Sequence, residues 1–205
     1  MKKISPKKSP DTKSRLIQAA YELFLKHGYH GTSMREIAAR AGLSVAAAYN
    51  HFKNKDELFI AILRQYHPYT RILPALAEVK GDTVEDFLRQ GARLMIQVLG
   101  RKPGFLRLML IEIVEFDSRH IPALFAEVIP QLMDFTRSVT RRKGSLRPFP
   151  LPVLVRSFAG LFVSYYISEI LVWKYLPKSM QTDCLDDFVE IYLHGVLAPA
   201  PTGAK

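Results

Sequence analysis

Several small and polar residues between positions 31 and 58 could together recognise a nucleic acid. The donor groups of Arg35 match the edge of guanine, and the amide of Asn50 matches the edge of adenine. Ala46 and Ala47 are small enough to let a helix approach the bases, and an alanine can touch the methyl group of thymine. These residue types predict contact with the major groove of duplex DNA.

Two short helices joined by a tight turn would position these side chains. Ser33 and Glu36 have the spacing of a capping box, which predicts a helix start at Ser33. Gly42 can take the left-handed conformation that ends this helix, and Ser44 can cap the next helix. Asn54 can cap a further helix. No acidic residue lies between positions 43 and 56, so no carboxylate there would repel phosphates. The order of elements is that of a helix-turn-helix.

The stretch from about residue 13 to residue 63 resembles the DNA-binding domain of the TetR family of transcriptional regulators. The resemblance rests on GTSMREIAARAG, on the tyrosine, histidine and phenylalanine of the block YNHF, and on NKDEL, all at unbroken spacing. It implies phosphate contacts by Tyr49, His51 and Lys55, with hydroxyl or amide contacts by Thr32 and Ser33. The base-reading candidates are Arg35, Ser44, Ala46, Ala47 and Asn50.

Charge is concentrated in the same part of the chain. The whole sequence carries a formal net charge of +10, and residues 1–55 hold 11 basic against 3 acidic side chains, a net +8. A basic N-terminal region suits DNA, although charge alone fits RNA or a membrane surface equally well. The single cysteine, Cys184, excludes an internal disulfide and suits a reducing compartment. The longest charge-free apolar run near the C-terminus is too short to span a bilayer. We therefore expect a cytoplasmic protein that does not associate with a membrane.

Helical spacing dominates the whole chain, and no strand alternation is persuasive. The expected fold is all-α, with about nine helices in an N-terminal three-helix helix-turn-helix domain and a C-terminal helical domain for ligand binding and dimerisation. Pro68 and Pro74 predict a kink or break near His67. The expected division is a disordered basic arm at 1–10, the DNA-binding domain at 11–57, the ligand-sensing and dimerisation domain at 58–198 and a flexible tail at 199–205.

The helix expected at about 153–176 is apolar nearly all round, so it lies either in the core or against a second subunit. Small residues at four-residue intervals would permit close helix approach. The family resemblance implies a homodimer built through the last two long helices. The candidate interface residues are Gly160, Ser164, Ser168, Phe188 and Tyr192.

A small hydrophobic effector is expected to bind in the helical body. The candidate pocket residues are Tyr66, Phe105, Met109, Glu112, Phe116, Phe125, Phe162, Tyr165, Glu169 and Trp173. Glu112 and Glu169 stand inside apolar helices, where an unpaired charge is costly. Each either forms a salt bridge to Arg93, Arg107, Arg156 or Lys174, or supplies an acidic wall suited to a lipophilic cation or amine.

The combined reading is a ligand-responsive repressor that binds a palindromic operator in double-stranded DNA as a homodimer. A nonspecific architectural DNA binder is the alternative, and a body that senses another protein also stays open. An enzyme is not expected, because the sequence holds no GxSxG, P-loop or dinucleotide fingerprint. The histidines at 27, 30 and 51 fit no closed zinc motif, so neither a metal nor a cofactor is expected.

Overall fold

The computed structural model describes residues 11–100, 104–140, 142, 144 and 146–197. The arm expected at 1–10 and the tail expected at 199–205 lie outside these residues. Within the described residues the secondary structure is helical, and an isolated bridge between Leu146 and Leu197 is the β contact found there. The expected all-α fold is confirmed.

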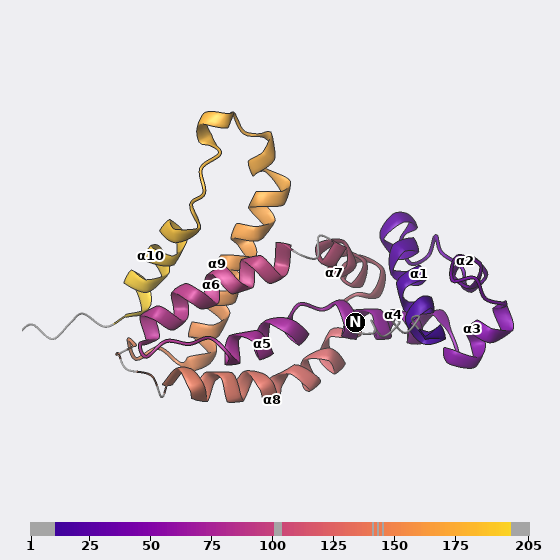
Figure 1. Ribbon diagram of the computed structural model, residues 1–205, viewed down its shortest axis with the longest axis horizontal. Helices are drawn as coiled ribbons and strands as arrows, with labels where there is room; N and C mark the ends of the chain where they lie inside the picture. Colours follow the sequence, from indigo (N-terminus) through magenta and orange to yellow (C-terminus); the bar gives the residue numbers. More distant parts are fainter. Residues whose placement is uncertain (1–10, 101–103, 141, 143, 145, 198–205) are drawn as a thin grey trace, which may run out of the picture. The chain divides into compact units, whose positions relative to one another are not determined.

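Figure 1 shows the helices in chain order. Their bounds are α1 (Thr12–His27), α2 (Met34–Arg40), α3 (Val45–His51), α4 (Lys55–Tyr66), α5 (Tyr69–Ala77), α6 (Val84–Gly100), α7 (Gly104–Phe116), α8 (Ile121–Thr140), α9 (Leu151–Leu171), η1 (Trp173–Tyr175), η2 (Lys178–Met180) and α10 (Leu185–Val196).

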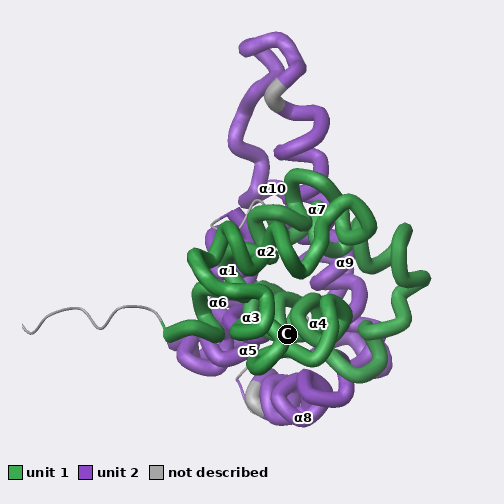
Figure 2. The backbone as a smooth tube through the Cα atoms, turned by 90° about the vertical axis from the view of Figure 1, so that its right-hand side faces the viewer, with its two compact units in different colours: residues 1–67, 104–124 green, residues 68–103, 125–205 purple. Residues whose placement is uncertain are grey.

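The chain divides into two compact units, coloured green and purple in Figure 2. Unit 1 comprises Met1–His67 and Gly104–Leu124, and unit 2 comprises Pro68–Pro103 and Phe125–Lys205. This division differs from the boundary expected after residue 57. Both α4 and α7 contribute buried apolar side chains to the core that also holds α1, α2 and α3, so they belong to unit 1.

Local caps start the helices of the helix-turn-helix where the sequence predicts them. The Ser33 hydroxyl accepts from the amide of Glu36 at 3.2 Å, while the Glu36 carboxylate accepts from the Ser33 amide at 2.7 Å. Ser44 caps α3 and Asn54 caps α4 in the same way, each accepting from the amide three residues later. Gly42 has φ 67° and follows α2, a conformation that glycine takes without strain.

Aromatic side chains join α7 to the rest of unit 1. The ring of Phe116 lies 4.5 Å from that of Tyr29 and 4.6 Å from that of Phe59. Gly104 lets the start of α7 approach α1, since a Cβ there would lie 2.1 Å from the Tyr21 hydroxyl oxygen. A helix from the middle of the chain therefore completes the core around the helix-turn-helix.

The break expected near His67 is confirmed, because α4 ends at Tyr66 and His67 is its C-cap. The chain then forms α5, which was not expected as a separate helix. Pro68 stands at the N-cap of α5, where a missing N–H costs nothing, and Pro74 is accommodated inside the helix.

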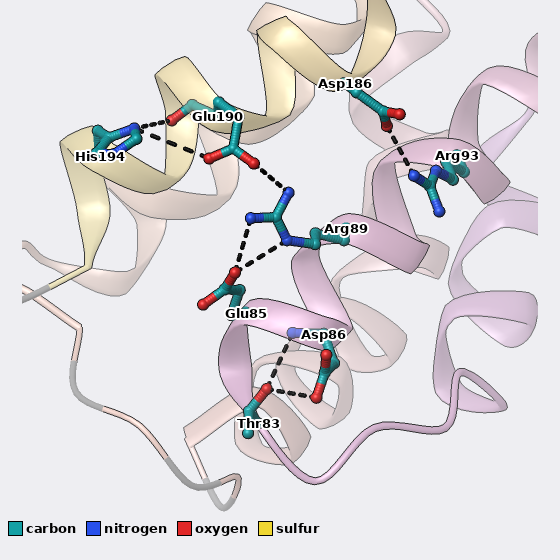
Figure 3. A network of polar contacts seen from close by, with 8 residues as sticks. All are labelled: Thr83, Glu85, Asp86, Arg89, Arg93, Asp186, Glu190 and His194. Carbon is teal, nitrogen blue, oxygen red and sulfur yellow. Dashed lines mark hydrogen bonds and ion pairs between the residues drawn. The ribbon is translucent and has the colours of Figure 1, made fainter.

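In unit 2, α6 packs against α5, α9 and α10. Figure 3 shows ion pairs that join α6 to α10: Arg89 pairs with Glu190 at 2.5 Å, and Arg93 pairs with Asp186 at 2.8 Å. Arg89 also pairs with Glu85, one turn earlier on α6, at 2.7 Å. One guanidinium thus bridges carboxylates of two helices.

Helix α9 is 21 residues long and ends at Leu171, earlier than the expected residue 176. By length and composition it could cross a membrane, a property it shares with core helices of soluble proteins, and 22% of its apolar window is buried. Within unit 2, Figures 1 and 2 both show the end of α9 and the segment that leads to α10 extending away from α6 and α8. Much of the apolar surface of α9 is therefore uncovered in the single chain.

Candidate functional site

The outward side of α3 carries small and neutral polar side chains. Ala46 and Asn50 are exposed, and Tyr49 is 49% exposed. On the opposite side, Ala48 is fully buried and Phe52, directly after the helix, is 2% exposed. The helix is thus anchored by one face, while Ala46 and Asn50, two of the side chains predicted to read bases, are exposed on the other face.

Side-chain contacts join α2 to α1 and so fix the position of the helix against which α3 packs. The guanidinium of Arg15 donates to the carbonyl oxygen of Ala41 at the end of α2. Arg40, near the end of α2, pairs with Glu22 of α1 at 2.6 Å. Because α2 also packs against α3, these contacts hold α3 on the core of unit 1.

Predicted site residues at the start of α2 differ in what they can offer. Arg35 is exposed, and so is Ser33, although its hydroxyl is part of the capping box. Thr32 is only 3% exposed; its hydroxyl donates to the Gly28 carbonyl at 2.9 Å and its amide to the Tyr29 carbonyl at 3.2 Å. The expected outward contact by Thr32 is therefore corrected, since both of its donors are used within the protein.

Lys55 is also engaged within unit 1. Its Nζ donates to the carbonyl oxygens of Tyr29 and Thr32, at 2.6 and 2.7 Å, and lies 4.0 Å from the centroid of the Tyr29 ring. Burial lowers the pKa of the Lys55 ammonium, against the opposing effect of Glu115 and Glu36. With two carbonyls as acceptors, the ammonium keeps one donor for a phosphate.

Sequence reasoning missed Glu115, which holds the same turn from α7. Its carboxylate accepts from the backbone amides of Tyr29 and His30, at 3.1 and 2.9 Å. Position 115 lies more than eighty residues after the turn, so no local spacing could have indicated the contact. The sequence signal was limited to a carboxylate within an apolar helix.

A cavity of about 840 Å³ lies within unit 2. Side chains of α5, α6, α8, α9 and α10 line it, and most of them are apolar. Its aromatic lining residues are Tyr69, Phe87, Phe125, Phe135, Phe158 and Tyr192. Among the lining residues that the structure describes, Arg156 is the one that carries a formal charge.

The residues that line the cavity differ from the ten candidate pocket residues. Of the ten candidate residues, Phe125 alone appears in its lining. Five of the others belong to unit 1, namely Tyr66, Phe105, Met109, Glu112 and Phe116. The remaining four are in unit 2 but away from this lining, namely Phe162, Tyr165, Glu169 and Trp173. Tyr165 packs against Phe188 of α10, with ring centroids 5.1 Å apart, and Trp173 lies in η1 beyond the end of α9.

Glu112 does not form an acidic wall of this cavity, because it is fully buried in unit 1. Its carboxylate accepts from the amide of His120 at 2.8 Å and pairs with the His120 Nδ1 at 2.9 Å. This corrects the cation-binding interpretation of Glu112. Its partner is His120, which is not one of the basic residues expected for a salt bridge, and Arg93 of that set pairs with Asp186 instead. For Glu169, burial and then the nearby Asp183 raise the pKa of the carboxyl group.

The candidate interface residues fall into two groups, those exposed on α9 and those that pack within their own chain. Gly160 and Ser164 are exposed on α9, and the Ser168 hydroxyl donates to the carbonyl of Tyr165 one turn earlier. Tyr192 is buried within unit 2, where its hydroxyl donates to the Leu154 carbonyl at 2.7 Å. Phe188 and Tyr192 therefore pack on α9 of their own chain. Within the described residues, no three His, Cys, Asp or Glu side chains gather as a metal site would require.

Comparison with known proteins finds matches to the N-terminal helices and to the whole chain. The family described as bacterial regulatory proteins, tetR family, matches residues 16–62. An uncharacterised HTH-type transcriptional regulator of Bacillus subtilis, YvkB, is 25% identical over 197 residues, which cover 91% of this chain and 98% of YvkB.

Solved structures share the fold. A tetR-family transcriptional regulator from Mesorhizobium loti is 24% identical with a TM-score of 0.66, and the match covers 91% of this chain and 97% of that one. NalD of Pseudomonas aeruginosa, described as the secondary repressor of a multidrug efflux pump, is 20% identical with a TM-score of 0.67, covering 92% of this chain and 98% of NalD. At these identities the likeness concerns the fold alone.

Proposed function

Because this chain belongs to the tetR family of bacterial regulatory proteins, we propose that it represses transcription by binding a palindromic operator as a homodimer. A small hydrophobic molecule that enters the cavity of unit 2 releases the operator. Regulators of this family bind DNA, are generally cytoplasmic and are not enzymes, and the proposal extends this location and absence of catalysis to the present chain.

The observation that carries this proposal is the exposed face of α3. Small side chains let a helix approach the major groove closely, hydrogen-bonding groups can read base edges, and a face without carboxylates avoids repulsion by the phosphates. This face offers Ala46, Asn50 and the capped start at Ser44. The proposed base-reading residues are Arg35, Ser44, Ala46, Ala47 and Asn50, and the proposed phosphate contacts are Ser33, Tyr49, His51 and Lys55.

Dimerisation would cover apolar surface that the single chain leaves exposed. Leu171 at the end of α9, its C-cap Val172 and Tyr175 of η1 are exposed, as is Ile191 of α10. Pairing of α9 and α10 with the same helices of a second copy would bury these side chains under two-fold symmetry. The same symmetry would place two α3 helices about 34 Å apart, at successive major grooves.

The lining of the cavity supports a hydrophobic effector. Two of its hydroxyl groups are already used: that of Thr136 donates to the Met133 carbonyl at 2.7 Å and that of Tyr192 to the Leu154 carbonyl at 2.7 Å. A ligand would therefore gain mainly by burying apolar surface. Arg156 is the charged lining residue, which favours neutral or anionic lipophiles over cations.

Selection of bound duplexes from a random DNA pool, followed by sequencing and footprinting at moderate salt, tests the proposal. A recurring palindrome whose half-sites are one helical turn apart would support a specific dimer. Enrichment of DNA without a shared sequence would contradict it and favour an architectural DNA-binding protein. The effector arm of the test adds lipophilic compounds to the complex with the selected palindrome and measures release.

A further inference from the structure

The turn between α1 and α2 is held from two sides by opposite charges. Glu115 of α7 accepts from the amides of Tyr29 and His30, at 3.1 and 2.9 Å. Lys55 of α4 donates to the carbonyls of Tyr29 and Thr32, at 2.6 and 2.7 Å. A carboxylate thus takes the N–H groups of the turn and an ammonium takes its carbonyl groups. Charge-assisted bonds of this kind fix the orientation of the peptide planes.

Gly28 makes this arrangement possible. It ends α1 with φ 74°, a conformation that other residues adopt with strain. A Cβ at this position would also lie 3.0 Å from Oε1 of Glu115, so glycine gives the carboxylate room to approach the backbone. The Glu115 side chain is 20% exposed, which limits competition by water for these hydrogen bonds.

The position of this turn determines how the DNA-binding helices are presented. The turn leads directly into Ser33, the N-cap of α2, and α2 packs against α3. A change in the turn would therefore tilt α2 and alter the direction of α3. The hydrogen bonds of Glu115 go to Tyr29 and His30, so its influence on DNA would act through the turn.

The chain also connects α7 to helices that line the cavity. Helix α7 belongs to unit 1, but α6 precedes it and α8 follows it, and both contribute lining residues such as Met95 and Phe125. A ligand that displaces α8 would act on residues 117–120, which join α8 to the end of α7. This connection is separate from the one between α4 and α5.

We infer that Glu115 is a positioning residue for DNA binding, through which α7 passes the effect of a ligand in the cavity to the helix-turn-helix. The regulatory part of this inference rests on the proposed function, because it needs a ligand and an operator. The positioning of the turn concerns unit 1 alone, and amide exchange at the turn measures it without either of them.

The first experiment compares the full-length Glu115→Gln variant with Glu78→Gln, which makes the same charge change at an exposed position after α5. Amide hydrogen exchange at residues 29 and 30 is expected to accelerate in Glu115→Gln only. Affinity for the selected palindrome is expected to fall about ten-fold relative to Glu78→Gln, with affinity for unrelated duplex unchanged. Unchanged exchange at this turn, or equal losses on both DNAs, would overturn the positioning role.

Glu115→Asp provides a second variant in case Glu115→Gln does not fold. It keeps the charge but shortens the side chain by one methylene group, so the two amides are expected to exchange faster here too. Exchange as slow as in the unchanged protein would again overturn the positioning role.

The second experiment uses Nile red, a neutral lipophilic dye, as the cavity probe. The affinity of the protein for the dye is measured with and without the palindrome. The affinity without DNA divided by the affinity with DNA gives the coupling between the two sites. This ratio is expected to be closer to one in Glu115→Gln than in the unchanged protein and in Glu78→Gln. Equal ratios above one in all three would overturn the regulatory part. A ratio of one in the unchanged protein would instead contradict the proposed ligand response, and the exchange result would still decide the role of Glu115.

Discussion

Glu112 and His120 form a buried pair that closes the end of α7: the carboxylate accepts from the His120 amide at 2.8 Å and lies 2.9 Å from its Nδ1. Between them the chain turns through Asp117 and Ser118, which have φ 50° and 58°. The backbone carbonyl of Glu112 accepts from the Ser118 amide at 3.0 Å, so one residue holds the turn by its side chain and its main chain.

Glu112→Ala is expected to lower the free energy of unfolding by about 3 kcal/mol, because it leaves the amide and imidazole of His120 buried without their acceptor. Urea unfolding measures this, with Glu78→Ala as a control at an exposed position. Nile red affinity of the folded variant is expected to equal that of the unchanged protein. A loss of dye binding with unchanged stability would place Glu112 in the ligand site after all.

Asn50→Ala and Lys55→Ala are expected to weaken DNA binding in different ways. Asn50 lies on the exposed face of α3, so its loss should change preference at one base position, by about 1–3 kcal/mol. Lys55 has one donor left for a phosphate, and losing that contact should weaken binding to all sequences alike, in addition to the loss on the palindrome that follows from loosening the turn. Affinities for a set of single-base variants of the palindrome distinguish the two. Identical profiles for both variants would refute this division of roles.

His67 is expected to make stability depend on pH. Burial lowers the pKa of its imidazole from 6.5 to about 4. Since the folded-state pKa lies below the unfolded one, the stabilising contribution is present above pH 6.5 and is lost as the pH falls through about 4. The loss amounts to at most about 3 kcal/mol.

Urea unfolding at a series of pH values across this window, for the unchanged protein and His67→Phe, measures the contribution. The aromatic replacement keeps a ring against Phe105, whose centroid lies 5.4 Å from that of the imidazole. The variant is expected to lose less stability than the unchanged protein as the pH falls. Parallel curves would show that His67 does not cause the dependence.

Decanol, decanoate and decylammonium test the charge preference of the cavity with one hydrocarbon chain. Displacement of Nile red is expected to be weakest for decylammonium, because Arg156 is the charged lining residue. Arg156 is exposed, so the difference between the anion and the cation should be only a few-fold. Arg156→Gln should remove this difference and leave decanol unaffected. Tightest binding by decylammonium would restore the acidic-wall interpretation.

Ile191→Arg is expected to shift the protein from dimer to monomer, because this 66% exposed side chain lies on α10 in the proposed interface. Val114→Arg is the matched control, since Val114 is 77% exposed on α7 and outside that interface. Sedimentation at several concentrations measures the change. Monomer formation by Val114→Arg alone would move the interface to α7.

Local features of the fold could be predicted from the sequence because they depend on residues three or four positions apart. The caps at Ser33, Ser44 and Asn54 each need a single amide three residues later, and all three form as predicted. Such contacts place the helices of the helix-turn-helix in order along the chain. They say little about which distant helix completes the core.

The cavity could not be predicted in the same way, because five helices far apart in sequence line it. An apolar or aromatic residue has the same helical spacing whether it faces a cavity or a core, as Phe125 and Phe116 illustrate. The partner of Glu112 was equally hidden, since His120 reaches it only through a turn with two positive φ angles. Helix α5 was not predicted because Pro68 and Pro74 indicated a break in the chain. Pro68 instead lies at the N-cap of α5, and Pro74 lies inside the helix.

The discontinuity of unit 1 has a consequence for the engineering of biosensors. The simplest chimera of two regulators cuts the chain after α4 and exchanges everything before the cut. In this protein such an exchange would leave Glu115 and Phe116 facing the turn and the core of a foreign protein. A graft that also transfers residues 104–124 keeps the donor's own contacts, and a working exchange therefore requires three junctions in the gene.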